Sequence, residues 1–247
     1  MTRPVSPKWK DRVLTPRPGS CRSLDHSCDI VFGNMYPTLI ADTSKRVLLA
    51  VLALGLLPTI ASSQEIQQIT VAGERAILAK PNIEITDARN PDVTIVEYFD
   101  YNCPFCRRLA PTLRQLIAGD KKIALIYKDW PVLGDVSVYA ARCALAAQWQ
   151  GKYFVAHDAL LGSSGLSQND QVDAVLRSAG INVKRLKKDL SSHAQDITVM
   201  LARTDAEAHA LELRGTPGIL VGRQLVSGIA DLSFFQKLVA EVRSEAK

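Results

Sequence analysis

The chain has 247 residues, a length that suits one large domain or two small ones, and its hydrophobic content of 47% is ordinary for a packed core. The formal net charge is +5, but most of this excess lies in residues 1–63, which carry eight Lys or Arg against four Asp. Residues 64–247 have a net charge of only +1. Composition therefore gives no support to nucleic-acid binding.

A secretory signal is predicted ahead of residue 64. Two basic residues at 45–46 precede an apolar run over 47–57, which Pro58 and small residues up to Ser63 follow. This order is typical of an export signal, and the apolar run is shorter than the about 20 residues of a membrane span. We expect cleavage near Ser63 and a periplasmic protein, with an uncleaved anchor as the alternative.

The stretch ahead of the apolar run is unusually long, and Met35 would begin a signal of conventional length. With Met35 as the predicted true start, Cys21 and Cys28 do not belong to the mature protein. An odd number of cysteines in an oxidising compartment is most simply one pair and one leftover thiol. The cysteines that remain are Cys103, Cys106 and Cys143.

The close pair lies between a predicted strand and a predicted helix. Residues 93–99 (VTIVEYF) are β-branched, aromatic and almost continuously apolar, which predicts a buried central strand. From Leu109 to Ile117 apolar residues recur at helical spacing. Pro104 suits the first turn of this helix, so Cys103 lies at its N-terminus. There the helix dipole and unpaired N–H groups favour a thiolate.

The rest of the chain alternates between helical and strand patterns, and residues 66–78 are compatible with one helix. This order indicates an α/β protein, a split domain with a helical insertion. The predicted elements are a strand at 123–127, a long helix at 136–161, helices at 169–178, 183–190 and 194–213, paired strands at 218–221 and 224–226, and a helix from 232 to about 243.

Three sequence features together resemble the DsbA-like branch of thioredoxin-fold thiol-disulfide oxidoreductases. They are YFDYNCPFCRR (98–108) with Pro111, YKDWPVLGDVSVYAARCALAAQ (127–148) and GTPGILVG (215–222). The match spans most of 82–247 and implies a thioredoxin fold with a helical insertion at about 135–213. Residues 64–81 form a short N-terminal segment before it, and 1–63 form the extension and signal.

The resemblance implies roles for four residues. Cys103 is the exposed nucleophile, and Cys106 is the buried partner that resolves a mixed disulfide. The bond between Thr216 and Pro217 is cis and lies beside the cysteines, where the neighbouring backbone groups could pair with an extended substrate. The sequence alone would favour an ordinary trans loop proline.

The resemblance also places an acid, Glu97, beneath the disulfide, where it helps to move protons to and from the buried cysteine. Burial would raise the pKa of Glu97 and suit it to this task. The alternatives are a strand-edge position or an ion pair with Lys128.

The residues between the cysteines, Pro104 and Phe105, predict a milder oxidant than relatives with Pro-His there, because phenylalanine offers the sulfur neither a hydrogen bond nor a positive charge. Arg107 and Arg108 could restore some positive potential, although surface arginines are usually only solvated. Cys143 is expected to be a buried, inert thiol.

We expect no metal and no cofactor. Zinc needs a second ligand pair, which the mature chain lacks, and His157, His193 and His209 fall on separate helices, where surface or capping roles are expected. A purely structural disulfide over so short a loop would gain little stability.

The predicted function is thiol-disulfide exchange with exported proteins, most simply as an oxidase. Thr216 before Pro217 resembles isomerase-like members, so an isomerase or reductase is the alternative, and a copper or zinc carrier a less favoured one. The expected partners are client proteins with thiols or disulfides and a membrane redox partner, without nucleic acid. The short segment 64–80 lacks heptad repeats, which favours a monomer.

Overall fold

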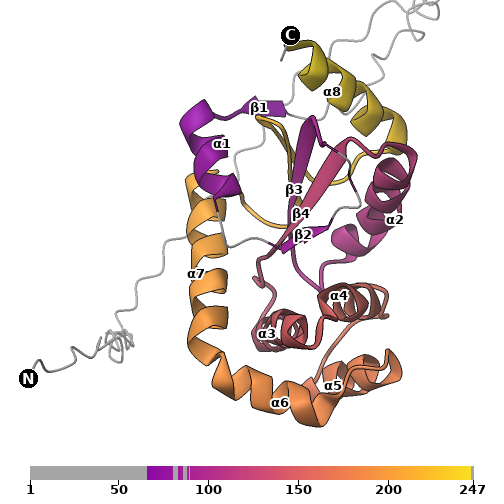
Figure 1. Ribbon diagram of the computed structural model, residues 1–247, viewed down its shortest axis with the longest axis vertical. Coiled ribbons are helices and arrows are strands. Elements are labelled where there is room, and N and C mark those ends of the chain that lie inside the picture. The colour runs from indigo at the N-terminus through magenta and orange to yellow at the C-terminus, as the bar shows by residue number, and fades with distance from the viewer. Residues whose placement is uncertain (1–65, 80–82, 86–87, 89, 246–247) are drawn as a thin grey trace, which may run out of the picture. The chain divides into compact units, whose positions relative to one another are not determined.

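The structure is a computed structural model that describes residues 66–79, 83–85, 88 and 90–245 (Figure 1). The predicted signal and its cleavage site, Met35, Cys21 and Cys28 lie outside the described residues. Within the described ranges, no helix combines the length and the apolarity needed to cross a membrane.

The described elements follow one another in this order: β1 (Ile66–Gln68), α1 (Val71–Leu78), β2 (Ile83–Ile85), β3 (Val93–Phe99), α2 (Pro104–Gly119), β4 (Ile123–Asp129), α3 (Asp135–Ala147), a 3₁₀ turn (Gln148–Gln150), α4 (Tyr153–Leu161), α5 (Asn169–Ser178), α6 (Val183–Ser192), α7 (Ala194–Ala210), β5 (Gly218–Val221), β6 (Gln224–Ser227) and α8 (Leu232–Glu245).

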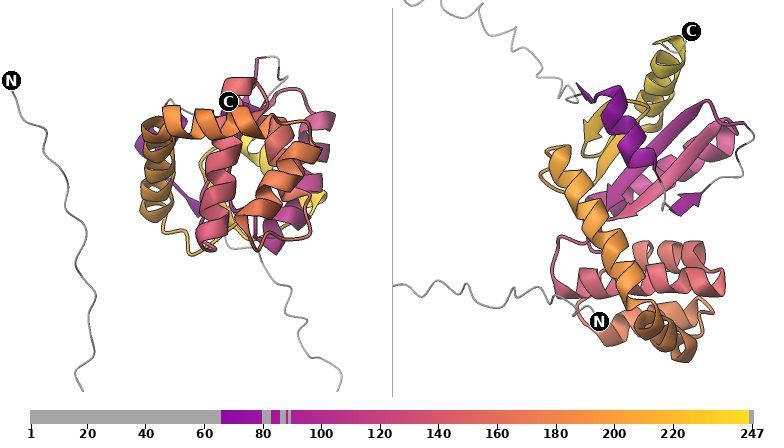
Figure 2. Two further views of the ribbon diagram at one scale, coloured as in Figure 1. Left: turned by 90° about the horizontal axis from the view of Figure 1, so that it is seen from below. Right: turned by 60° about the vertical axis from the view of Figure 1, so that its left-hand side comes forward.

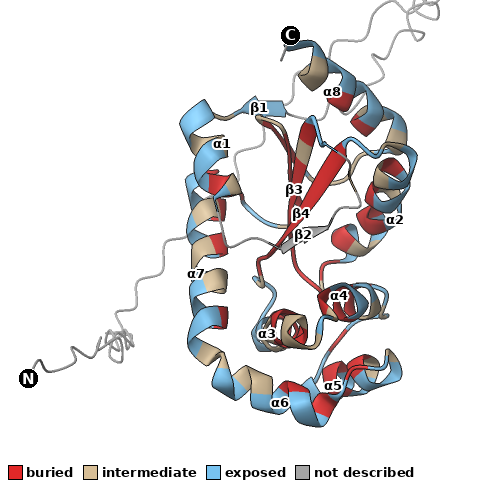
Figure 3. Ribbon diagram, viewed as in Figure 1, coloured by how far each residue is buried: buried red, intermediate tan, exposed pale blue. Residues whose placement is uncertain are grey.

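One mixed sheet organises these elements, with the strand order β1-β6-β5-β3-β4-β2. β3 is central, parallel to β4 and antiparallel to β5. Its buried residues bear out the strand predicted over 93–99, and β3 and β4 are red along most of their length in Figure 3. The helix that joins these two parallel strands is α2, which carries the cysteine pair at its start.

Side chains alternate between the two faces of the sheet, as the period of a strand requires. Ile95, Phe99 and Leu125 face the core that α2 and α8 cover, whereas Val96 and Tyr98 face a second core under α1 and the end of α7. Glu97 therefore points to the same face as α2.

Helices α3 to α7 are inserted between β4 and β5, and α3 packs against α4, α5 and α6. In Figure 2 this group lies beyond one end of the sheet, and α7 leads back from it to the sheet. The insertion follows β4 directly, so it lies next to the loop between β3 and α2. This is the predicted α/β arrangement with a helical insertion.

The long helix predicted over 136–161 is wrong, because two helices occupy it. α3 ends at Ala147, a 3₁₀ turn follows, and α4 begins at Tyr153. Gly151 has φ 66°, a left-handed conformation that ends a helix and that glycine adopts without strain. One long helix was predicted because apolar residues recur at helical spacing on both sides of the break, where α3 and α4 bury side chains in the same core.

The single helix considered for residues 66–78 is also wrong. Ile66–Gln68 forms β1, antiparallel to β6 at the sheet edge, and the Thr70 hydroxyl caps α1 by accepting the Gly73 N–H at 3.1 Å. The strand β2, which pairs with β4, was not predicted. Both short strands are defined by distant partners, so neighbouring residues give them a weak pattern. The predicted 123–127 strand runs two residues further, to Asp129.

Candidate active site

The cysteine pair lies at the start of α2, as predicted. Cys103 is the residue that caps the helix and Pro104 is its first helical residue. The Cys103 Sγ accepts the backbone N–H of Cys106 at 3.4 Å, and the Cys103 N–H donates to the Asp100 carbonyl at 3.1 Å. The two cysteines are not joined by a disulfide in this structure.

The two sulfurs differ sharply in acidity. A hydrogen bond from the Cys106 thiol, together with backbone N–H groups of Cys106 and Phe105, lowers the pKa of Cys103 to about 5, although burial opposes this shift. The pKa of Cys106 is raised by its hydrogen bond to Cys103, by burial and by the negative charge of Glu97. At neutral pH the first sulfur is therefore a thiolate and the second holds its proton.

The exposure expected for Cys103 is wrong for this structure, because the residue is only 3% exposed. Its sulfur lies 3.2 Å from the carbonyl oxygen of Thr216, on a loop more than a hundred residues later in the chain. That loop covers the helix start, which the spacing of the cysteines does not reveal. Phe105, beside the pair, is 47% exposed.

The peptide bond between Thr216 and Pro217 is cis, which confirms the prediction and rules out the trans alternative. Pro217 is buried and directly precedes β5, the neighbour of β3 in the sheet. This pairing brings the cis-proline loop to the end of β3, where the cysteine loop begins.

Glu97 is fully buried on the central strand, and among the residues that the structure describes neither of its carboxylate oxygens has a hydrogen-bond partner. Burial, followed by the negative charge of Cys103, raises the pKa of Glu97 to about 8, against a smaller opposing effect of Arg114. Both alternatives for Glu97 are wrong. β3 is not an edge strand, and Lys128 faces the other side, where it pairs with Glu207 at 2.7 Å.

Asp100 is a site residue that the sequence analysis missed. Its buried carboxylate accepts four hydrogen bonds: one oxygen takes the Asn102 N–H and the Ser137 hydroxyl, both at 2.7 Å, and the other takes the N–H groups of Val132 and Leu133 at 2.8 and 2.9 Å. Asp100 thus fastens the cysteine loop to the start of the helical insertion. The sequence does contain a signal for this role: Asp100 and Asn102 stand directly ahead of Cys103, and both residue types favour turns in which their side chains bond to nearby backbone groups.

Asn102 makes a second connection to the insertion. Its side-chain amide donates to the Leu166 carbonyl at 3.0 Å, and its side-chain oxygen accepts the Leu166 N–H at 2.9 Å. Two loops of the insertion are therefore bound to the four residues that precede Cys103.

His157 contradicts the expected surface or capping role, because it is fully buried. Its ring stacks on Tyr127 with centroids 4.0 Å apart, and its Nδ1 lies 3.3 Å from the hydroxyl of Tyr101. Burial lowers the pKa of His157 to about 3, so the ring is neutral at physiological pH. His157 lies among aromatic side chains between α4 and the sheet. The helical spacing of the sequence does not predict which side of α4 faces the sheet.

Two other histidines do lie at helix ends. His193 separates α6 from α7 and stacks on Trp149 at 3.7 Å, and His209 is in the last turn of α7, where its Nδ1 lies 2.8 Å from the Asp205 carbonyl. Cys143 is buried as predicted, and burial raises its pKa to about 12.

The arginines after the pair make local contacts. Arg107 donates to the Tyr101 carbonyl at 3.2 Å, and the Arg108 guanidinium lies 4.7 Å from the centre of the Phe105 ring. Across the described part of the chain, no group of three His, Cys, Asp or Glu side chains is placed to hold a metal ion.

This geometry defines a thioredoxin-type dithiol site: an acidic thiol at a helix start, a buried second thiol, a buried acid and a cis-proline loop. Residues 94–240 match the DSBA-like thioredoxin domain family. The chain belongs to this family, and its α/β fold is the predicted thioredoxin fold with a helical insertion.

Two solved structures are similar over most of their length. A thioredoxin-like oxidoreductase from Silicibacter pomeroyi is 38% identical, with a TM-score of 0.63, and the match covers 66% of this chain and 92% of that one. The thiol-disulfide exchange protein alpha-DsbA2 from Wolbachia pipientis is 27% identical, with a TM-score of 0.62, and the match covers 69% and 96%.

A curated relative is much longer than the shared region. The Na(+)/H(+) antiporter NhaA 1 of Salinispora arenicola is 29% identical over 136 residues. These residues are 54% of this chain but only 20% of the antiporter. The chain therefore spans about a fifth of that protein's length.

Proposed function

We propose that this protein is an exported thiol-disulfide oxidoreductase that exchanges disulfides with folding proteins through Cys103 and Cys106, chiefly as an oxidase. The observation that carries the proposal is the position of the two sulfurs: Cys103 caps α2 and accepts the Cys106 N–H, which favours its thiolate, whereas Cys106 is buried one turn into the helix and keeps its proton. A stable thiolate makes Cys103 a good leaving group and favours the reduced form of the pair, so the disulfide form is oxidising.

The reaction begins with the Cys103–Cys106 disulfide. A client thiolate attacks the Cys103 sulfur, a mixed disulfide forms, and the bond to Cys106 breaks. Cys106 leaves with the electron pair and takes up a proton. A second client thiolate then attacks the client sulfur of the mixed disulfide, and Cys103 leaves as a thiolate. The client loses two electrons, which the dithiol gains.

Glu97 supplies the proton that Cys106 takes up. In the dithiol form its pKa is about 8, and burial, the larger cause of this shift, also raises the pKa in the disulfide form, so the carboxyl group holds a proton that it can give to Cys106. Glu97 lies on the α2 side of the sheet. In the opposite direction, the Glu97 carboxylate takes the proton back as the pair is reoxidised. A membrane redox partner serves as the electron acceptor in this scheme.

The test is the reduction potential of the pair, measured by equilibration with glutathione buffers. An oxidase gives a value of about −120 to −180 mV, and we expect the milder end of that range because of Phe105. A value near −270 mV would indicate a reductase. Because Thr216 resembles the isomerase-like members, the oligomeric state is measured alongside, and a multimer would favour an isomerase.

Two further measurements separate exchange from metal carriage. Cys103→Ser is expected to abolish disulfide exchange, and retained exchange would refute the site. A metal carrier would instead bind stoichiometric Cu(I) or Zn²⁺ in the reduced form and keep it against a chelator. Export is tested by N-terminal sequencing of the periplasmic protein, which is expected to begin near Gln64.

A further inference from the structure

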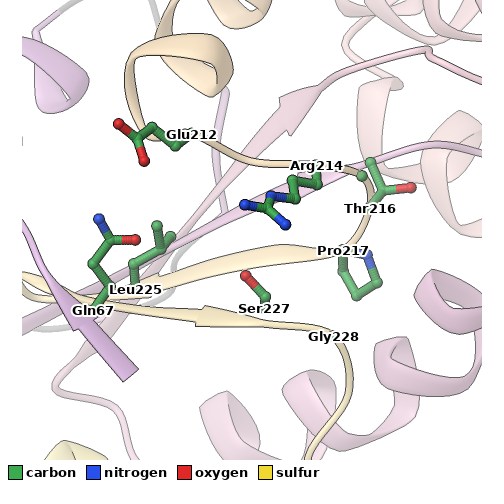
Figure 4. Close-up of a pocket in the computed structure, with 9 residues that line it drawn as sticks. Gln67, Glu212, Arg214, Thr216, Pro217, Leu225, Ser227 and Gly228 are labelled. Atoms are coloured by element: carbon green, nitrogen blue, oxygen red, sulfur yellow. The ribbon is translucent and has the colours of Figure 1, made fainter. Parts of the chain in front are cut away.

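A pocket of about 520 Å³ adjoins the cis-proline loop (Figure 4). It lies between the end of α7, the loop that follows it, and the strands β6 and β1. Among the residues that line it are Gln67, Glu212, Arg214, Thr216, Pro217 and Ser227. Neither cysteine lines this pocket, and the exchange chemistry described above makes no use of it.

Thr216 lies between the pocket and the dithiol site, although Leu225 places the pocket on the α1 side of the sheet. Thr216 lines the pocket, and its carbonyl oxygen is 3.2 Å from the Cys103 sulfur. An extended chain advances about 3.3–3.6 Å per residue. Three residues of extended peptide span about 10 Å, so a peptide that is disulfide-bonded to Cys103 and passes over the cis-proline loop brings its nearest residues toward the pocket.

Arg214 is the charged group that faces the interior of the pocket. Figure 4 shows its guanidinium pointing into the space between Gln67 and Ser227, whose side chains also project there. Arg214 is exposed, and within the described part of the chain it forms no ion pair and no side-chain hydrogen bond. Its five N–H donors are therefore available to a ligand.

Glu212 limits what the pocket can accept. Its carboxylate lies at the rim, at the end of α7, and extends away from the Arg214 guanidinium in Figure 4. The N–H donors of Arg214 therefore stay available to a ligand, while the Glu212 carboxylate repels a second acidic group of that ligand. A planar guanidinium matches a carboxylate through two parallel hydrogen bonds, and Gln67 and Ser227 offer further donors.

We propose that Arg214 binds the carboxylate of one acidic side chain that lies within about three residues of the reacting cysteine in a client protein. The inference rests on the proposed exchange function and adds a substrate preference to it. Clients with a single Asp or Glu near the cysteine react faster than clients with the matching amide, whereas a run of acidic residues gains no more than one does.

The test uses the full chain in its oxidised form and amidated single-cysteine peptides that differ only by Glu or Gln at each position from −3 to +3. Amidation removes the terminal carboxylate, so any effect comes from the side chain. The second-order rate constant of thiol exchange is measured for the wild type, Arg214→Gln and Arg214→Lys. A carboxylate also changes the peptide thiol itself, but this effect cancels when the Glu/Gln ratios of two protein variants are compared.

The wild type is expected to favour Glu about 3- to 10-fold at one position, the range of one exposed or half-buried charge pair. Arg214→Gln brings this ratio to about one, Arg214→Lys gives a value in between, and added salt lowers the wild-type ratio. Arg223→Gln, in the turn between β5 and β6 and outside the pocket lining, is the matched control and keeps the preference.

Equal ratios in the wild type and Arg214→Gln at every position would overturn the carboxylate subsite while leaving the exchange function intact. Loss of the preference in Arg223→Gln as well would also overturn it, because the effect would then be one of net charge. If no peptide reacts with any variant, the proposed function itself fails, and the subsite fails with it.

Discussion

At the scale of single residues, the site depends on three ionisable groups with shifted pKa values. Hydrogen bonds to the Cys103 sulfur lower its pKa to about 5, whereas Cys106 is shifted upward. Glu97 has no hydrogen-bond partner within the described part of the chain, and burial is the main cause that raises its pKa to about 8. An unpartnered buried carboxyl group is costly to keep, which is typical of a functional group.

Glu97→Gln is expected to change the pH dependence of exchange. In the wild type, the step that expels Cys106 slows as pH rises through the pKa of Glu97, which burial raises, because Glu97 loses the proton it donates. Glutamine carries no transferable proton, so the variant is slower at neutral pH and lacks this inflection. Stopped-flow fluorescence over pH 6–9.5 measures it, and an unchanged profile would refute the role of Glu97.

We also expect Glu97→Gln to change how the free energy of unfolding depends on pH. The folded-state pKa of Glu97 lies above its unfolded value, so its contribution is fully present below pH 4.5 and is lost as pH rises through about 8. Up to about 1.4 kcal/mol per pH unit disappears in this window. In the reduced protein Cys103 contributes a slope of opposite sign, because its folded-state pKa lies below its unfolded value. The Glu97 slope is therefore measured as the pH dependence of the difference in unfolding free energy between the wild type and Glu97→Gln, and the exposed Glu241→Gln is expected to show no such pH-dependent difference.

At the scale of elements, the cysteine loop is held by its neighbours. Asp100 binds the loop to residues 132–137, and Asn102 binds it to Leu166. The start of α2 is therefore fixed by the helical insertion as well as by the sheet. Thr216 approaches from a third element.

Asp100→Asn separates two effects on the Cys103 thiolate. Loss of a negative charge alone would lower the Cys103 pKa, whereas loss of loop positioning would raise it, because the N–H groups at the sulfur would move. Since an amide can satisfy only one of the two pairs of donors, we expect the pKa to rise and stability to fall by about 1–3 kcal/mol.

Thiolate absorbance near 240 nm and the reduction potential measure this change. The matched control is Asp231→Asn, which removes a carboxylate that accepts the Phe234 N–H and the Ser233 hydroxyl at the start of α8. It is expected to cost stability without moving the Cys103 pKa. A lowered pKa in Asp100→Asn would contradict the positioning role.

Two glycines test the break between α3 and α4. A Cβ would meet open space at both Gly119 and Gly151, but only Gly151 has a left-handed φ. Gly151→Ala is expected to destabilise the protein by about 1 kcal/mol, and Gly119→Ala, in the last turn of α2, to stabilise it by up to about 1 kcal/mol. Thermal unfolding that moved in the same direction for both variants would contradict this assignment.

At the scale of the whole molecule, a buried ion pair links α7 to the sheet. Lys128 on β4 pairs with Glu207 at 2.7 Å and also donates to the Ile77 carbonyl of α1 at 3.2 Å. The Glu207 carboxylate also accepts hydrogen bonds from the Arg203 guanidinium and the Tyr98 hydroxyl. This network joins α1, α7 and two strands on the face opposite the dithiol.

Glu207→Gln is expected to lower the free energy of unfolding by about 3 kcal/mol, because it leaves the buried Lys128 ammonium without its counter-charge. Lys128→Met, which removes the charge and keeps an apolar stem, is expected to cost less. Urea unfolding measures both. The reduction potential is expected to stay unchanged, since the pair lies on the other face from the cysteines.

The sequence by itself determined the features that neighbouring residues encode. The apolar run at 93–99, Pro104 and the helical spacing up to Gly119 placed the cysteine pair at a helix start after a buried strand, and the family resemblance supplied the cis bond before Pro217. The strand and the helix start depend on local propensity and periodicity, which neighbouring residues encode, whereas the cis bond was implied by the family resemblance alone.

The tertiary structure alone decided the features that distant segments make together. β1 exists because β6 lies beside it, Cys103 is covered because Thr216 returns to it, and His157 is buried because α4 packs against the sheet. Arg214 faces a pocket for the same reason. Strand pairing and burial between distant segments depend on the packing of the whole fold, so the spacing of neighbouring residues does not predict them.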